Sequence, residues 1–123
     1  MGRMQLPTLS IFLARLGVAF CFIAFGVWEL QEPEMWSTYV PGYMSAIAPL
    51  ALLVQLHAVV LIVTALGVLS GIWPRFWTLI AALTLLELCL IVFEGEGFSD
   101  VFVRDVSLFL FTAGLTAQTW KRA

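Results

Sequence analysis

The chain has 123 residues, of which 62% are hydrophobic and 11% are charged, and its formal net charge at pH 7 is −2. A soluble domain of this length has no interior large enough for so much apolar surface, and the small net charge gives no sign of a nucleic-acid partner. The length suits one domain. The composition therefore predicts a single membrane domain that several helices cross.

Four apolar stretches follow one another, at about residues 9–30, 50–72, 76–93 and 101–120. In the hydrocarbon layer every backbone polar group needs a partner within its own segment, so stretches of this length are expected to be α-helices. The fourth is short if it begins at Val106, and it reaches a spanning length only if it begins near Val101. The predicted fold is an all-α membrane four-helix bundle, formed by one domain over residues 1–123.

The links between the stretches differ in length. Only Trp73, Pro74 and Arg75 separate the second stretch from the third, so these two helices are expected to be antiparallel neighbours, with Pro74 ending the first of them. Residues 31–49 mix aromatic, proline and small polar residues. We expect this longer link to lie at the membrane surface, as a short interfacial helix or a partly re-entrant turn.

Charges are segregated between the two sides of this arrangement. Four basic residues share one side, namely Arg3, Arg75, Lys121 and Arg122, whereas Arg104 lies on the other. Six acids lie in the two opposite links, namely Glu29, Glu32, Glu34, Glu94, Glu96 and Asp100. Because cytoplasmic loops carry an excess of Lys and Arg, both termini are predicted to be cytoplasmic, in a bacterial-type inner membrane.

Polar residues within the stretches predict a cluster near the acidic side. At about 1.5 Å per residue, His57 and Glu87 each lie about 10 Å from the acidic end of their helices, so they can lie at one depth in antiparallel neighbours. Four further residues lie near or just above that depth, namely Glu29, Gln55, Arg104 and Asp105. If these side chains face inward, they form a polar cluster in the outer half of the bundle.

Two interpretations of the cluster stay open. Ionisable residues within a membrane are costly and often functional, and histidine titrates near neutral pH, so His57 and Glu87 would carry protons or hydrogen-bond the carbonyls of a quinone. Alternatively, they only pair and hold two helices together. Asp105 near a helix N-terminus is stabilised by the dipole alone, which favours a structural role for it.

Arg15 lies in the inner part of the first stretch, away from the cluster. Its side chain is expected to snorkel to the cytoplasmic surface; the alternatives are a buried contact or a site for an anionic lipid or ligand. Close helix packing is predicted at two small-residue motifs, Gly67-x-x-x-Gly71 and Ala113-x-x-x-Ala117, inside the bundle or between copies of the chain. Cys21 and Cys89 form no Cys-x-x-Cys pair, so we expect small packing residues and no metal site.

Four motifs connect the chain with a known family. They are RLG at residues 15–17, FGVWEL at 25–30, LGVLSGIWPR at 66–75 and RDVSL at 104–108, where the Arg-Asp pair is the most distinctive element. On these motifs the chain resembles the DoxX family (DoxX/DoxD-like small membrane proteins) over nearly its whole length. The resemblance implies a four-helix membrane bundle, and some relatives are linked to quinone-coupled sulfur oxidation or thiol redox complexes.

The function expected from these observations is that of an accessory or structural subunit. Its partners would be membrane lipids and either a larger redox or electron-transfer complex or further copies of the chain. The alternative is a quinone-interacting redox component that uses the polar cluster, with quinone as the only cofactor considered. A small transporter is a weaker alternative, because no broken helix or repeat offers alternating access. No catalytic motif or cysteine pair is present, so enzymatic activity is not expected.

Overall fold

The computed structural model describes residues 6–122, and every element in this part of the chain is a helix. Four helices are long: α1 (Leu6–Gln31), α3 (Leu50–Ser70), α4 (Pro74–Glu96) and α5 (Asp100–Arg122). Three are short, and all three lie in the first link: α2 (Pro33–Trp36), η1 (Ser37–Tyr39) and η2 (Gly42–Ala46). The all-α prediction is confirmed; Arg3 lies outside the described residues.

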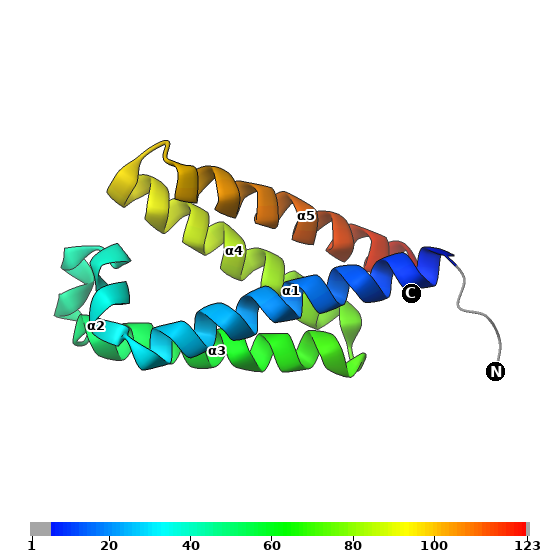
Figure 1. The fold of residues 1–123 in the computed structure, drawn as a ribbon, viewed down its shortest axis with the longest axis horizontal. Helices are drawn as coiled ribbons and strands as arrows, with labels where there is room; N and C mark the ends of the chain where they lie inside the picture. Colours follow the sequence, from blue (N-terminus) through cyan, green and yellow to red (C-terminus); the bar gives the residue numbers. More distant parts are fainter. Residues whose placement is uncertain (1–5, 123) are drawn as a thin grey trace.

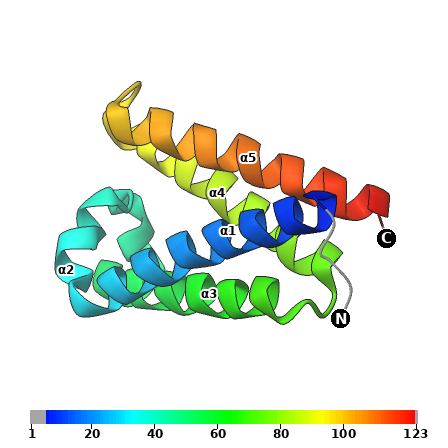
Figure 2. The ribbon, with the colours of Figure 1, turned by 45° about the vertical axis from the view of Figure 1, so that its right-hand side comes forward.

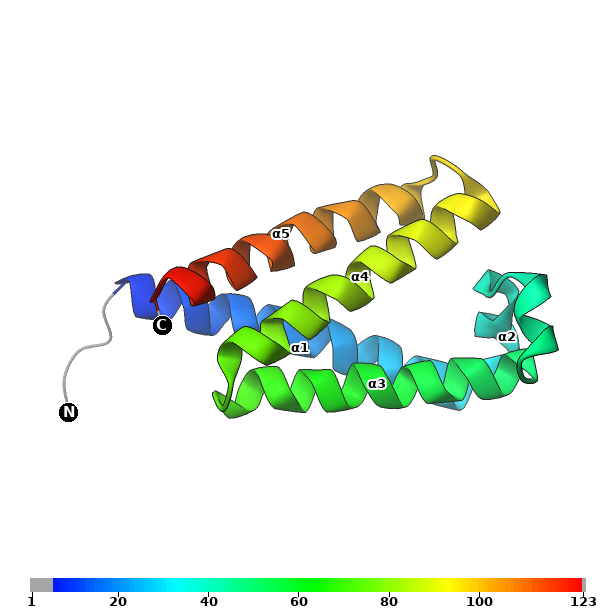
Figure 3. The same cartoon turned by 180° about the vertical axis from the view of Figure 1, so that it is seen from behind.

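The long helices form two antiparallel pairs. Helix α1 packs along α3, and α4 packs along α5, with fewer contacts between the pairs. The pairs approach each other near the α3–α4 turn and spread apart toward the opposite end (Figure 1). Seen from behind, the short helices of the first link fold back at the spread end (Figure 3). We call this the link end, formed by residues 32–49 and 97–99.

Both ends of the described chain lie at the other end of the molecule, which we call the terminal end (Figure 2). Three helices are long and apolar enough to cross a membrane, over Thr8–Gln31, Leu50–Ser70 and Pro74–Glu96. Three of the four predicted spans are therefore confirmed as span-capable helices. The fourth stretch does form helix α5, but it is not among these three, because charged and polar residues interrupt its apolar sequence.

The turn between α3 and α4 differs from the prediction. Helix α3 ends at Ser70 because Gly71 takes a left-handed conformation, with φ 75°, which glycine adopts without steric cost. Pro74 was expected to end α3, but it does not. Instead it is the first residue of α4, a position at which the missing N–H is not needed and the fixed φ suits the helix.

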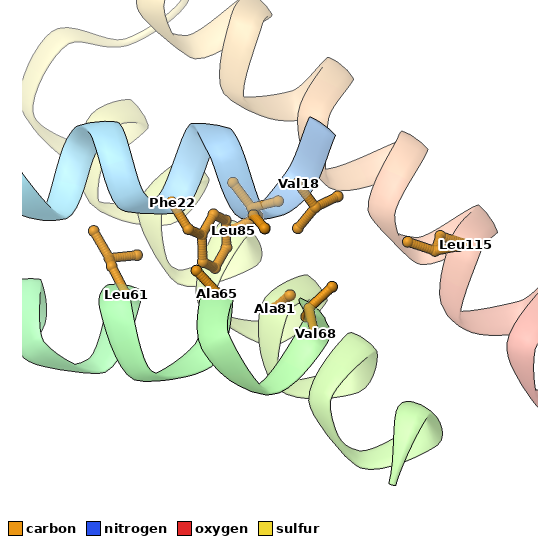
Figure 4. Packing of buried hydrophobic residues seen from close by; sticks show 9 residues of the cluster. Val18, Phe22, Leu61, Ala65, Val68, Ala81, Leu85 and Leu115 are labelled. Carbon is orange, nitrogen blue, oxygen red and sulfur yellow. The ribbon is translucent and has the colours of Figure 1, made fainter. Parts of the chain in front are cut away.

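The apolar core lies between the two pairs, in the middle of the molecule. Figure 4 shows Phe22 of α1 above Leu61 and Ala65 of α3, with Leu85 of α4 behind them. Gly67 lies where α3 meets α4, and a Cβ there would overlap the ring of Trp77. Gly67 therefore makes room for a tryptophan ring, which differs from the close approach of helix backbones that was predicted for it.

The other predicted packing residues behave differently. Gly71 is the cap of α3, Ala113 is half-buried and Ala117 is exposed. Helix α5 instead packs through buried threonines: Thr112, Thr116 and Thr119. The Thr116 hydroxyl donates to the Thr78 carbonyl of α4 at 2.9 Å. A threonine face, rather than the alanine face, thus joins α5 to α4 within the described chain.

Two arginines hold helix ends together at the terminal end. Arg15 of α1 donates from Nε and Nη2 to the Val68 carbonyl of α3, and Arg75 donates to the Trp120 carbonyl of α5 at 3.2 Å. Cations are favoured there because carbonyls at a helix C-terminus carry partial negative charge. Arg15 thus makes a contact within the chain. This was the predicted alternative to snorkelling at the cytoplasmic surface.

Candidate functional site

A cavity of about 270 Å³ lies between the four long helices toward the link end. Side chains from α1, α3, α4 and α5 line it, together with Trp36, Tyr39, Val40 and Met44 of the first link. Most of the lining is apolar. The polar side chains are few, and they come from the four long helices and the first link: Glu29, Trp36, Tyr39, His57, Glu87, Arg104 and Asp105.

His57 of α3 lies between two carboxylates. Its Nδ1 is 3.0 Å from Glu29 Oε1, where an Nδ1–H donates to the carboxylate, and its Nε2 is 3.3 Å from Glu87 Oε1. Glu29 is buried, whereas 53% of the Glu87 side chain is exposed. Glu87 therefore lies at an opening of the cavity, and the three residues connect α1, α3 and α4.

Close approach of α1 to α3 positions the Glu29–His57 contact. Gly26 lies one turn before Glu29, and a Cβ there would be 2.7 Å from Ile62 Cγ1 and 3.1 Å from the Ala58 carbonyl oxygen. A larger residue would push the helices apart at that level. Because Gly26 lets α1 approach α3 closely, the Glu29 carboxylate lies within hydrogen-bonding distance of the His57 ring.

Arg104 and Asp105 contribute a second polar group from α5. Asp105 is buried, and its Oδ1 accepts from Nε and Nη2 of Arg104, each at 3.3 Å. The guanidinium also lies 5.1 Å from the centre of the Phe25 ring of α1, a favourable cation–π distance. Among the described residues, no ion pair joins this group to the His57 group.

Trp36 is the residue of the site that the sequence analysis did not single out. Pro33 begins the short helix α2, which turns the chain back after α1, and the Trp36 ring packs against Phe25 at 5.9 Å and Tyr39 at 5.7 Å between ring centres. Its indole therefore faces the cavity. The mixture of prolines and aromatics in this link was the only signal in the sequence.

Two buried nitrogen atoms of this site have no hydrogen-bond partner among the described residues: Trp36 Nε1 and His57 Nε2. His57 Nε2 nevertheless has the Glu87 carboxylate as an ion-pair neighbour at 3.3 Å. A buried donor without a partner costs free energy. Both atoms are covered by protein atoms in this structure, so a ligand in the cavity would reach them only after neighbouring side chains move.

The structure places five of the six residues of the predicted cluster in the lining of the cavity: Glu29, His57, Glu87, Arg104 and Asp105. Gln55 is exposed and does not line the cavity, so that part of the prediction is wrong. Arg15 lies at the terminal end, away from the site. Cys21 lines the cavity and Cys89 is buried nearby in α4, both as free thiols.

The charges of the cavity disfavour an anionic ligand. Its lining holds three carboxylates, Glu29, Glu87 and Asp105, against one arginine and one histidine. Within residues 6–122 no group of acids, cysteines and histidine has the arrangement of a metal site. An uncharged molecule with hydrogen-bonding atoms suits the cavity best.

Comparisons of the chain with models of protein families, with curated proteins and with solved structures find no match.

Proposed function

We propose that the chain is an integral membrane protein that binds a quinone-type ligand in this cavity. Ligand sites are typically concave and mostly apolar, with a few placed polar groups, and this cavity has that character. An apolar cavity of about 150 Å³ accommodates a benzene ring. A volume of about 270 Å³ is therefore sufficient for a substituted ring.

The observation that carries the proposal is the buried Trp36 Nε1, which has no hydrogen-bond partner among the described residues, together with His57 Nε2, whose polar neighbour is the half-exposed Glu87. The indole N–H donates to a quinone carbonyl. His57 Nε2 donates to a carbonyl when the imidazole is protonated, and it accepts from a quinol hydroxyl when the imidazole carries its proton on Nδ1. The same residues therefore suit both the oxidised and the reduced ligand.

The membrane setting belongs to the same proposal. Helix α5 would be the fourth span, because it packs along α4, where the Thr116 hydroxyl donates to the Thr78 carbonyl. Both termini would be cytoplasmic, since Arg15, Arg75 and Lys121 lie toward the terminal end and lysine and arginine concentrate on the cytoplasmic side. Membership of the DoxX family and a bacterial inner-membrane location are further parts of this proposal.

Binding of decyl-benzoquinone to the purified protein in nanodiscs tests the function. Trp36→Phe keeps the ring but removes the N–H, so the affinity should fall about two- to tenfold, as expected for one lost hydrogen bond. The matched control is Trp28→Phe, since Trp28 is exposed and does not line the cavity. Equal affinities for both variants and the unchanged protein would contradict the proposal.

A second candidate function is that of an accessory subunit in a larger membrane complex. The observation that favours it is a set of small and polar residues exposed on α5, namely Ser107, Gly114, Ala117 and Gln118, which lie among exposed apolar residues such as Leu110 and Phe111. Small and polar residues suit contact between helices better than contact with lipid. Purification in a mild detergent, followed by native mass measurement, should yield a species heavier than one chain; a lone monomer would contradict this function.

A further inference from the structure

An apolar groove between α1 and α5 lies next to the cavity. We infer that the ligand carries a long hydrocarbon chain, which leaves the cavity through this groove while the ring stays beside His57 and Trp36. This inference rests on the proposed function and extends it, because it specifies the class of ligand and its direction in the site.

The residues that line both hollows are the first argument. The groove has a volume of about 280 Å³ and shares Cys21, Phe22, Leu85 and Leu108 with the cavity. Its remaining lining residues are Gly17, Val18, Phe111 and Thr112. These lie about one turn farther toward the terminal end on α1 and α5. A chain attached to a ring in the cavity therefore has a path that begins at the shared residues.

The lining of the groove is the second argument. Apart from the Thr112 hydroxyl and the Cys21 thiol, its side chains are hydrocarbon, and no charged residue lines it. The charged residues and the histidine of the site line the cavity instead. The cavity thus suits the polar ring of an amphiphile, and the groove suits its apolar chain.

The groove is also open along its outer side. Gly17 is exposed, a Cβ there would meet no atom within 4 Å, and 56% of Phe111 is exposed. Gly17 precedes Glu29 by about three helical turns, roughly 18 Å along α1. In a spanning α1 this position is near the middle of the hydrocarbon layer. A chain that emerges there passes directly among lipid tails, so the ligand can enter from the membrane.

Two probes and one substitution separate the chain path from the ring site. The probes are decyl-benzoquinone and the same ring without the chain, and binding is measured in identical nanodiscs with correction for partition into lipid. Gly17→Leu fills the groove without touching the polar residues. It should weaken decyl-benzoquinone about tenfold, the loss of a few buried methylene contacts, and leave binding of the bare ring unchanged. Gly17→Ala should cause a smaller loss.

Gly114→Leu is the matched control. Gly114 also lies within a long helix, a Cβ there also meets nothing within 4 Å, and it lines neither hollow. If Gly17→Leu binds decyl-benzoquinone as tightly as Gly114→Leu, or weakens both probes equally, the chain path is wrong while ring binding stands. If neither probe binds the unchanged protein, the proposed function and the chain path both fail.

Discussion

Arg15 of α1 and Val68 of α3 are joined by two hydrogen bonds, in which Nε and Nη2 of the guanidinium donate to one carbonyl oxygen at 3.0 and 2.6 Å. The acceptor lies in the last turn of α3, beside the Gly71 cap. The bonds therefore hold α1 against the end of the helix that carries His57. A charge inside the first apolar stretch thus has a partner within the chain.

Arg15→Ala should lower the free energy of unfolding by about 2 kcal/mol, since hydrogen bonds from a charged group contribute roughly that much. Arg15→Lys keeps the charge but loses the paired donors, so its free energy of unfolding should lie between those of the unchanged protein and Arg15→Ala. Unfolding in a denaturing detergent, followed by circular dichroism, measures the difference. Lys121→Ala, at an exposed position, is the control; an equal effect at both sites would contradict the assigned role.

Gly67→Ala should destabilise the protein by about 1–3 kcal/mol, the usual cost of overpacking. Its Cβ would overlap the Trp77 ring, so α3 and α4 must separate or the ring must move. Gly114→Ala makes the same change where a Cβ meets nothing, and it should be neutral or stabilising. Thermal unfolding of the two variants side by side distinguishes them, and equal midpoints would show that Gly67 has no packing role.

Removal of either carboxylate beside His57 should lower the free energy of unfolding, but by unequal amounts. Glu29→Ala leaves the buried Nδ1 of His57 without a partner, which costs about 1–3 kcal/mol. Glu87→Ala should cost about 1 kcal/mol or less, because a pair with a half-exposed partner is weakened by solvent. Chemical unfolding of both variants gives the comparison. A larger loss for Glu87→Ala would mean that the 3.3 Å contact is the stronger one.

Thr116→Val should loosen α5 from α4. The hydroxyl is buried and donates to the Thr78 carbonyl across the interface, as well as to Thr112 in its own helix. Polar bonds between membrane helices contribute about 0.6 kcal/mol on average, and valine has nearly the same shape as threonine. Thr116→Ser retains the hydroxyl and serves as the control. If the valine variant is as stable as the unchanged protein, packing alone holds α5 against α4.

Helix positions and the depth of polar residues were accessible from the sequence because both are local. A long apolar run must satisfy its own backbone in lipid, which predicts α1, α3 and α4 within a few residues. A constant rise per residue places His57 and Glu87 at one depth, and the structure brings them into contact. Helix α5 was harder, since charged and polar residues reduce its hydropathy.

Rotation of each helix about its axis and the path of the first link were decided only by tertiary packing. Depth alone did not distinguish Gln55, which is exposed, from His57, which lines the cavity two residues later. Gly26 sets the approach of α1 that makes Glu29 the hydrogen-bonded partner. Trp36 reaches the site because the link folds back over it. By itself the sequence determined an all-helical chain, with helices apolar enough to cross a membrane and a level of polar residues toward its acidic side. Which side chains meet there, and the groove beside them, depend on contacts between distant segments that no local pattern specifies.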